Sequence, residues 1–223
     1  MSRKTHCPKR WPIAPVGRPH GTPLTLAQRE VVRRCRALPQ LTDPLEIELV
    51  VSHAVSDVPV DEEFWAGVIE HAVSLPTRRN EALLRALAAL LTGRPREWAA
   101  RAAPPLPPEL VVGEAWICDR SIDAGYLALI CSYSYGVREH AMVFLVDELA
   151  GGMVRKAFVT RDVAVALVRL SEQGPLERVA PAAAHWLLSK SYDRLDRQAD
   201  LAVDVEVWRT RLLAGRRIAL AFG

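Results

Sequence analysis

The stretch YLALICSYSYGVREHAMVFLVDELAGGMVRKAFVT, residues 126–160, decides the fold. It holds three runs rich in β-branched and aromatic residues, at 125–135, 139–148 and 152–160, and such runs are typical of β-strands. The breaks between them, GVR and LAGG, have hairpin length and contain glycine. The run VVGEAWIC, residues 111–118, precedes them across the polar turn DRSIDAG. We therefore expect a four-stranded antiparallel sheet.

Helices are predicted on both sides of this sheet. Thr25 and Gln28 have the spacing of a capping box, and Asp43 with Pro44 forms another helix start. The expected N-terminal helices cover 25–38, 44–55, 61–75, 77–92 and 95–103. The expected C-terminal helices cover 162–170, 181–195 and 204–214. Alternation of apolar residues at 201–207 also fits a strand, but helical spacing continues to Leu213, which favours a helix.

The segment PPLPP, residues 104–108, cannot continue a helix and is the best internal boundary. The predicted organisation is therefore a proline-rich basic arm at 1–23, a helical region at 24–103, the linker at 104–108, and the sheet with its C-terminal helices at 109–223. We expect residues 24–223 to pack as one unit. The fold class is α+β.

Composition indicates a soluble globular protein of the cytoplasm. The chain has 223 residues, of which 50% are hydrophobic and 25% charged, and no apolar run approaches the roughly 20 residues that span a bilayer. The start of the chain has no apolar segment of the kind that directs export. Four scattered cysteines without a paired spacing predict reduced thiols, with Cys35 and Cys131 as small core residues. No membrane partner is expected.

Positive charge is concentrated at the N-terminus. Residues 1–40 contain nine basic residues and one acidic residue, a net charge of +8, whereas the remainder has 20 basic and 25 acidic residues, a net charge of −5. Such a segment can bind nucleic acid by releasing counterions from phosphates. The structural alternative is a solvated arginine face and an arm paired with the protein's own acidic body. The residues predicted to contact nucleic acid or an acidic partner are Lys9, Arg10, Arg18, Arg29, Arg33 and Arg36.

Catalytic candidates are weak and confined to the sheet region: Asp119, Asp123, His140 and Asp147. Carboxylates in loops at strand ends can act as acid and base or bind a metal, but residues of this type more often stabilise turns. His140 and Asp147 stand seven positions apart, so on one strand they would point to opposite faces. A two-residue turn at Gly136 and Val137 would instead set His140 opposite Tyr133 and diagonal to Cys131, which leaves a cysteine and histidine pair geometrically open.

No metal or cofactor is predicted. His6, Cys7, His20 and Cys35 could supply four zinc ligands, but their spacing matches no zinc-finger pattern. The phosphate-loop, dinucleotide-binding, serine-hydrolase, zinc-protease and kinase motifs are all absent. Gly151 and Gly152 join two strands and are turn glycines.

One resemblance extends from the helix at Pro44 to the C-terminal helices. The residues that carry it most clearly are His140, Ala141, Val143, Leu145, Val146, Asp147, Gly151 and Gly152. With them the chain resembles a set of uncharacterised proteins of GC-rich bacteria. Related chains often have His and Asn after the LVD strand, where this one has Glu148 and Leu149. The resemblance implies no activity.

Charge and the lack of catalytic motifs predict a non-enzymatic binding or regulatory protein. It would contact an acidic partner, such as nucleic acid, through the arm and the first helix. One alternative is a small hydrolase-like enzyme with Asp119, Asp123, His140 and Asp147 near one cleft. Another is a structural subunit of a protein assembly, for which an exposed apolar patch on a sheet face would be the sign.

Overall fold

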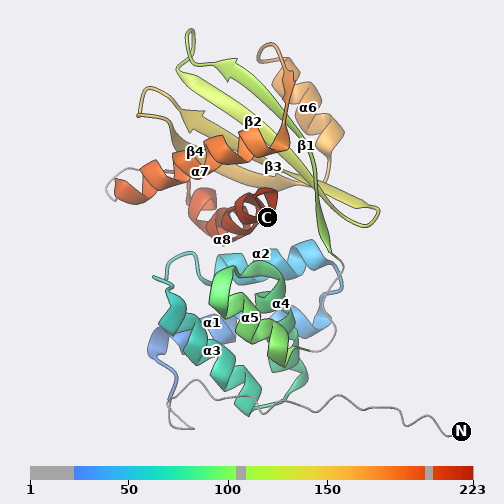
Figure 1. Ribbon diagram of the computed structural model, residues 1–223, viewed down its shortest axis with the longest axis vertical. Coiled ribbons are helices and arrows are strands. Elements are labelled where there is room, and N and C mark those ends of the chain that lie inside the picture. The colour runs from blue at the N-terminus through green and yellow to red at the C-terminus, as the bar shows by residue number, and fades with distance from the viewer. Residues whose placement is uncertain (1–22, 104–108, 199–202, 223) are drawn as a thin grey trace, which may run out of the picture.

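The structure is a computed structural model that describes residues 23–103, 109–198 and 203–222, and Figure 1 shows its arrangement. The N-terminal helices are α1 (Leu26–Arg34), the 3₁₀ helix η1 (Cys35–Gln40), α2 (Pro44–Ala54), α3 (Glu62–Ser74), α4 (Arg78–Leu90) and α5 (Gly93–Ala102). The strands are β1 (Leu110–Arg120), β2 (Tyr126–Tyr135), β3 (Arg138–Asp147), β4 (Met153–Thr160) and β5 (Glu177–Val179). The remaining helices are α6 (Val163–Ser171), α7 (Pro181–Arg197) and α8 (Val205–Ala221).

The sheet is antiparallel and has the strand order β4-β3-β2-β1-β5. The α+β class is confirmed, but the expectation of four strands is wrong because β5 pairs with β1 at the edge. β5 has only three residues in a polar segment, so no local pattern marks it, and pairing with β1 creates it. The predicted hairpin register is confirmed, since Tyr133 lies opposite His140 and Gly136 in the turn has a positive φ of 61°.

The sheet separates two groups of helices. α7 and α8 cover one face and α6 covers the other, where Ile130, Ala141 and Val163 form a small second core. On the α8 side, the N-terminal helices form a further layer, and α2 packs directly on α8 (Figure 1). The main core therefore runs from the N-terminal helices through α8 to the inner face of the sheet. The predicted linker at 104–108 lies outside the described residues.

Most helices begin where the capping residues predicted. Asp43, Asp61, Thr77 and Asp162 each accept a backbone hydrogen bond in the first turn. The first helix is shorter than expected, because the α-helical part ends at Arg34 and η1 follows. Pro39 explains this, since it has no N–H to continue the ladder and it disfavours α-helical geometry in the residue before it.

The last helix is longer than expected. α8 continues through Gly215 to Ala221, seven residues beyond the predicted end at 214. A glycine within a helix costs about 1 kcal/mol relative to alanine. Contacts that are distant in sequence offset that cost, because Arg217 beyond the glycine is fully buried and Ile218 packs on the main core. The choice of a helix over a strand from Val205 onward is confirmed.

Candidate acidic-partner surface and buried polar cluster

The capping box at the start of α1 sets the orientation of the predicted basic residues. The Thr25 hydroxyl accepts from the Gln28 N–H at 3.2 Å, and Gln28 Oε1 accepts from the Thr25 N–H at 2.9 Å. Gln28 Nε2 also donates to the Phe64 carbonyl at 2.9 Å, which fixes α1 against α3. Val31 and Cys35 are thereby buried, and the opposite side of the helix faces solvent.

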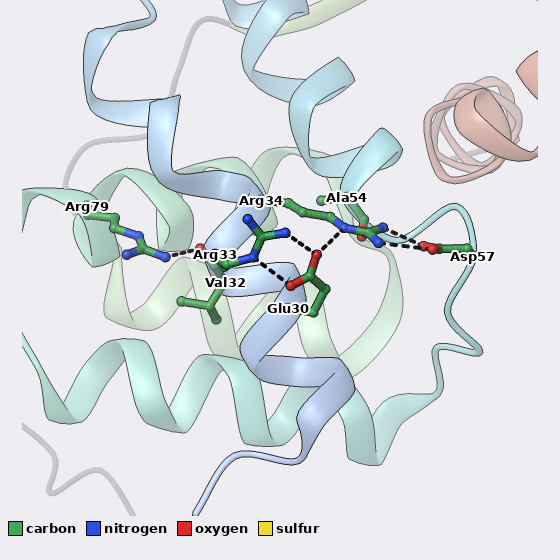
Figure 2. Close-up of polar contacts among 7 residues, drawn as sticks. All are labelled: Glu30, Val32, Arg33, Arg34, Ala54, Asp57 and Arg79. Carbon is green, nitrogen blue, oxygen red and sulfur yellow. Dashed lines mark hydrogen bonds and ion pairs between the residues drawn. The ribbon is translucent and has the colours of Figure 1, made fainter.

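Arg29, Arg33 and Arg36 are exposed on that side, and we call them the α1 basic surface. Arg33 is not free, because its Nε and Nη2 donate to the two oxygens of Glu30 at 2.7 and 2.5 Å (Figure 2). Hydrogen bonds from Arg33 and Arg34 lower the pKa of Glu30 to about 2, so this carboxylate stays charged. Arg29 and Arg36 have no ion-pair partner among the described residues.

Arg34 is also neutralised. Its Nη1 and Nη2 donate to the two oxygens of Asp57 at 2.5 and 3.0 Å, and Nη1 also donates to the Ala54 carbonyl (Figure 2). The charges of two carboxylates, Glu30 and Asp57, therefore balance the charges of Arg33 and Arg34. The charge available to a partner on this helix and η1 is that of Arg29 and Arg36.

Sequence reasoning missed Arg79. Its guanidinium donates to the Val32 carbonyl, on the other side of α1 from Asp57, and its Nε is buried without a partner in the described part of the chain (Figure 2). A signal was present, because Arg78 and Arg79 stand in the first turn of α4, where the helix dipole disfavours positive charge. The Arg79 guanidinium instead lies near the C-terminal end of α1, where the helix dipole favours a positive charge.

The other predicted contact residues, Lys9, Arg10 and Arg18, lie outside the described residues, as do His6, Cys7 and His20. Cys35 and Cys131 are buried free thiols, as predicted. No group of three or more His, Cys, Asp or Glu side chains within residues 23–103, 109–198 and 203–222 is placed to hold a metal ion.

Asp119 and Asp123 stabilise the turn between β1 and β2. Asp119 accepts from the Ser121 N–H at 2.9 Å, and the Arg120 guanidinium lies 2.6 Å from the Asp123 carboxylate. Hydrogen bonding from Ser121 lowers the pKa of Asp119, and the bond from Arg120 lowers the pKa of Asp123. A general acid at neutral pH needs a raised pKa, so these shifts oppose that role.

Asp147, at the end of β3, also has structural partners. It accepts from the Ala150 N–H at 2.9 Å in the β3–β4 turn and lies 3.6 Å from Arg155. An open cavity of about 450 Å³ adjoins it, lined in part by Tyr126 and Lys156. Asp147 lies opposite Tyr126, next to the β1–β2 turn, so the structure brings the three aspartates to one end of the sheet.

His140 lies at the opposite end. Seven positions at about 3.3 Å per residue separate it from Asp147 by roughly 23 Å. Its side chain is 1% exposed and faces the main core rather than a loop. The structure therefore does not bring His140 together with the aspartates.

His140 belongs instead to a set of buried polar side chains that we call the buried cluster. Its members are Glu48 of α2, Tyr133 and Tyr135 of β2, His140 of β3, His185 of α7 and Arg217 of α8. The centre is an ion pair, with Arg217 Nη2 at 2.6 Å from Glu48 Oε2 and both side chains almost fully excluded from solvent. Burial acts to lower the pKa of Arg217, but the Glu48 carboxylate outweighs it, so the pKa is raised and the guanidinium stays charged.

The ion pair fixes the tautomer of His140. Arg217 Nη2 lies 3.2 Å from His140 Nε2, and a guanidinium can only donate, so Nε2 accepts and the ring proton is on Nδ1. Burial and the Arg217 charge lower the pKa of His140 to about 3, which keeps the ring neutral. The rings of Tyr133 and Tyr135 stack near it, with centroids 5.6 and 5.9 Å away.

A second histidine is fixed in the same way. His185 Nδ1 lies 2.6 Å from the Pro181 carbonyl, which can only accept, so His185 Nδ1 donates and its Nε2 accepts from the Tyr133 hydroxyl at 2.8 Å. Burial lowers the pKa of His185. Both histidines are therefore neutral, and in each ring Nδ1 carries the proton and Nε2 accepts a hydrogen bond.

Sequence reasoning also missed Glu48 and Arg217, although a signal existed. Glu48 stands three positions after Leu45 and three before Val51, and Arg217 stands four after Leu213, so both fall on the buried face of their helices by helical spacing. A charged residue at such a position is buried only with a partner. The sequence does not tell which partner it is.

Comparison of the chain with protein-family models, with curated proteins and with solved structures finds no match. The resemblance drawn from residues 140–152 therefore stays a prediction. Among the helices of the described residues, none combines the length and the apolar character that crossing a membrane requires.

Proposed function

We propose that this protein is a cytoplasmic, non-enzymatic binding or regulatory protein that contacts an acidic partner, in the first place nucleic acid, through its basic N-terminal segment and the α1 basic surface. The observation that carries the proposal is that Arg29 and Arg36 are exposed and have no carboxylate partner in the described part of the chain. They follow directly on the segment that has most of the surplus positive charge.

The physical basis is counterion release. Each phosphate that a cation neutralises releases condensed counterions, so binding weakens steeply as salt rises. Ion pairs within the protein reduce this effect, and Arg33 and Arg34 are already paired. The contribution of α1 and η1 is therefore expected from Arg29 and Arg36, with further contacts from the segment that precedes them.

Two further observations support the proposal. The buried thiols Cys35, Cys118 and Cys131 are free, which suits a reducing compartment. Asp119, Asp123 and Asp147 each have a structural partner and lie apart from His140, which favours a binding protein over a hydrolase-like enzyme.

The test is binding of labelled mixed-sequence RNA and DNA to the full chain over a range of salt concentrations. The test variant is Arg29→Gln with Arg36→Gln, and the matched control is Lys156→Gln with Arg169→Gln, which removes the same charge from exposed positions in the sheet region. A further variant lacks residues 1–22.

Each phosphate contact contributes about 0.9 to the slope of log K against log salt for duplex DNA, so loss of two contacts should reduce the slope by about 1.8. The control should retain the slope of the unmodified chain. Absence of salt-dependent binding by the intact chain would refute the nucleic-acid proposal. Equal losses in the test and control variants would show that net charge, and not the α1 basic surface, determines binding.

A structural subunit of an assembly is the second candidate, because apolar side chains are exposed both on the sheet face beside α6 and on the outer side of α6. Phe158 is 48% exposed and lies opposite Val143 on the sheet face that α6 covers, while Val168 of α6 is 58% exposed. Patches of this type often mark protein interfaces. Analytical ultracentrifugation of the chain and of Phe158→Ser tests it. Association that the substitution abolishes would favour this candidate, and a monomer at all concentrations would oppose self-assembly.

A further inference from the structure

A cavity of about 310 Å³ lies where the N-terminal layer meets the sheet, close to the buried cluster. It is lined by Asp43, Leu45, Tyr135, Arg138, Glu139, His140 and Arg161. We call it the α2–β3 cavity, because the start of α2 and the start of β3 supply most of its lining. Its size falls at the lower end of the range for small-molecule sites, about 300–1,000 Å³.

One group on the cavity wall is an unpaired, directed donor. The bond from Arg217 to His140 Nε2 places the ring proton on His140 Nδ1, and this N–H has no acceptor among the described residues. His140 is 1% exposed and lines the cavity, and its Nδ1 is not among the fully buried unpaired atoms, so this N–H reaches the cavity surface. An occupant of the cavity with an acceptor atom can therefore accept a hydrogen bond from it.

Two residues behind His140 have buried polar atoms without a hydrogen-bond partner among the described residues. Arg217 Nε and Nη1 and Glu48 Oε1 are buried and have no hydrogen-bond partner in the described part of the chain. A native interior leaves few such atoms unpaired. Neither Glu48 nor Arg217 lines the cavity, so these three atoms lie behind its wall and do not contact an occupant directly.

The walls of the cavity have both signs of charge. Arg138, Arg161 and Asp43 lie on the His140 side, whereas the side chain of Glu139, one position from His140 on β3, projects to the sheet face of Ala141. Arg161 donates to Asp43 at 2.7 Å, whereas Arg138 lies 3.9 Å from the same carboxylate and is 62% exposed. Arg138 is thus the group that remains most available to a ligand.

From this arrangement we propose that the α2–β3 cavity binds a small zwitterion, a free α-amino acid with an apolar side chain. Its carboxylate accepts from His140 Nδ1–H and from Arg138, its ammonium group donates to Asp43, and its side chain packs on Leu45 and the ring of Tyr135. A simple anion would meet the Asp43 carboxylate, and a simple cation would meet two guanidinium groups. Only a ligand that has both charges matches the lining.

The proposal is independent of the α1 basic surface and is tested by calorimetric titration of the full chain with L-leucine and L-phenylalanine. Two analogues of leucine separate its charges, because N-acetyl-L-leucine lacks the ammonium group and L-leucinamide lacks the carboxylate. Ligand concentrations up to about 10 mM detect a Kd of about 1 mM. The expected result is that leucine or phenylalanine binds, and that both leucine analogues bind at least about tenfold more weakly than leucine.

Arg138→Gln is the main variant, because its exposed side chain can be changed without disturbing the core. It should weaken binding at least about tenfold, whereas Arg169→Gln on α6 should leave binding unchanged. His140→Asn retains a side-chain donor and serves as a second variant, with folding checked by circular dichroism. No binding of either amino acid, binding of either analogue as tight as that of leucine, or binding that Arg138→Gln does not alter would each overturn the proposal.

Discussion

Removing the charge of Arg217 should be among the most destabilising single changes in this protein. Arg217→Met leaves the Glu48 carboxylate buried with no counter-ion, at a site where the two side chains are 0% and 2% exposed. Breaking a buried pair from one side costs about 3–5 kcal/mol. The free energy of unfolding of a typical domain is about 5–15 kcal/mol, so the variant should lose a large part of its stability.

Removing both charges should reduce the free energy of unfolding far less than removing one. Replacement of a buried ion pair by apolar residues of similar volume is often neutral or stabilising by about 1–4 kcal/mol. In Glu48→Leu with Arg217→Met, the three unpaired atoms of the pair also disappear. His140 Nε2 loses its donor, which costs about 1 kcal/mol. The double variant should therefore be far closer in stability to the unmodified chain than either single variant.

Urea unfolding followed by far-UV circular dichroism measures these differences through the midpoint and slope of the transition. Arg178→Met is the matched control, because Arg178 pairs with Glu114 at the surface and is 68% exposed. Exposed pairs contribute about 0–1 kcal/mol, so the control should change little. The reasoning is refuted if Arg217→Met costs under about 1 kcal/mol, or if the double variant is as unstable as the single one.

Three other outcomes follow from local geometry. Gly136→Ala and Gly152→Ala should each cost about 1–2 kcal/mol because φ is +61° and +75°, and the Arg194 guanidinium near Gly152 ends an exposed, flexible side chain that can move aside; urea midpoints equal to that of the unmodified chain would contradict this. Cys131, whose pKa burial raises to about 12, should resist iodoacetamide at about pH 8 until the chain unfolds, and mass spectrometry of a modified native chain would contradict it. The pKa of His140 is about 3 in the folded chain and 6.5 in the unfolded chain. As the pH falls, His140 is therefore protonated in the unfolded chain before it is protonated in the folded chain. The stability from neutral His140 is complete above about pH 6.5 and is lost towards pH 3. His140→Gln should therefore show a weaker loss of stability with acid in urea titrations, and an unchanged pH dependence would contradict the assignment.

Local sequence signals predicted much of the candidate acidic-partner surface, but not how much of its charge is available. The capping box and the spacing of Arg29, Arg33 and Arg36 correctly predicted that these side chains are exposed, although Arg36 lies in η1 and not in α1. Helical spacing also allows a pair between Glu30 and Arg33 or Arg34. The partner Asp57 could not be predicted, because the fold brings it to Arg34 from 23 positions away.

By itself the sequence determined the class of the fold, the hairpin register at Gly136 and most helix starts, since caps, turns and apolar periodicity act over a few neighbouring residues. The tertiary structure alone decided the fifth strand, the extension of α8 through Gly215 and the buried cluster. Glu48 and Arg217 are separated by 169 positions, and their burial is favourable only when they meet. The physical reason is that a charge can leave water only once the whole chain has placed its partner beside it.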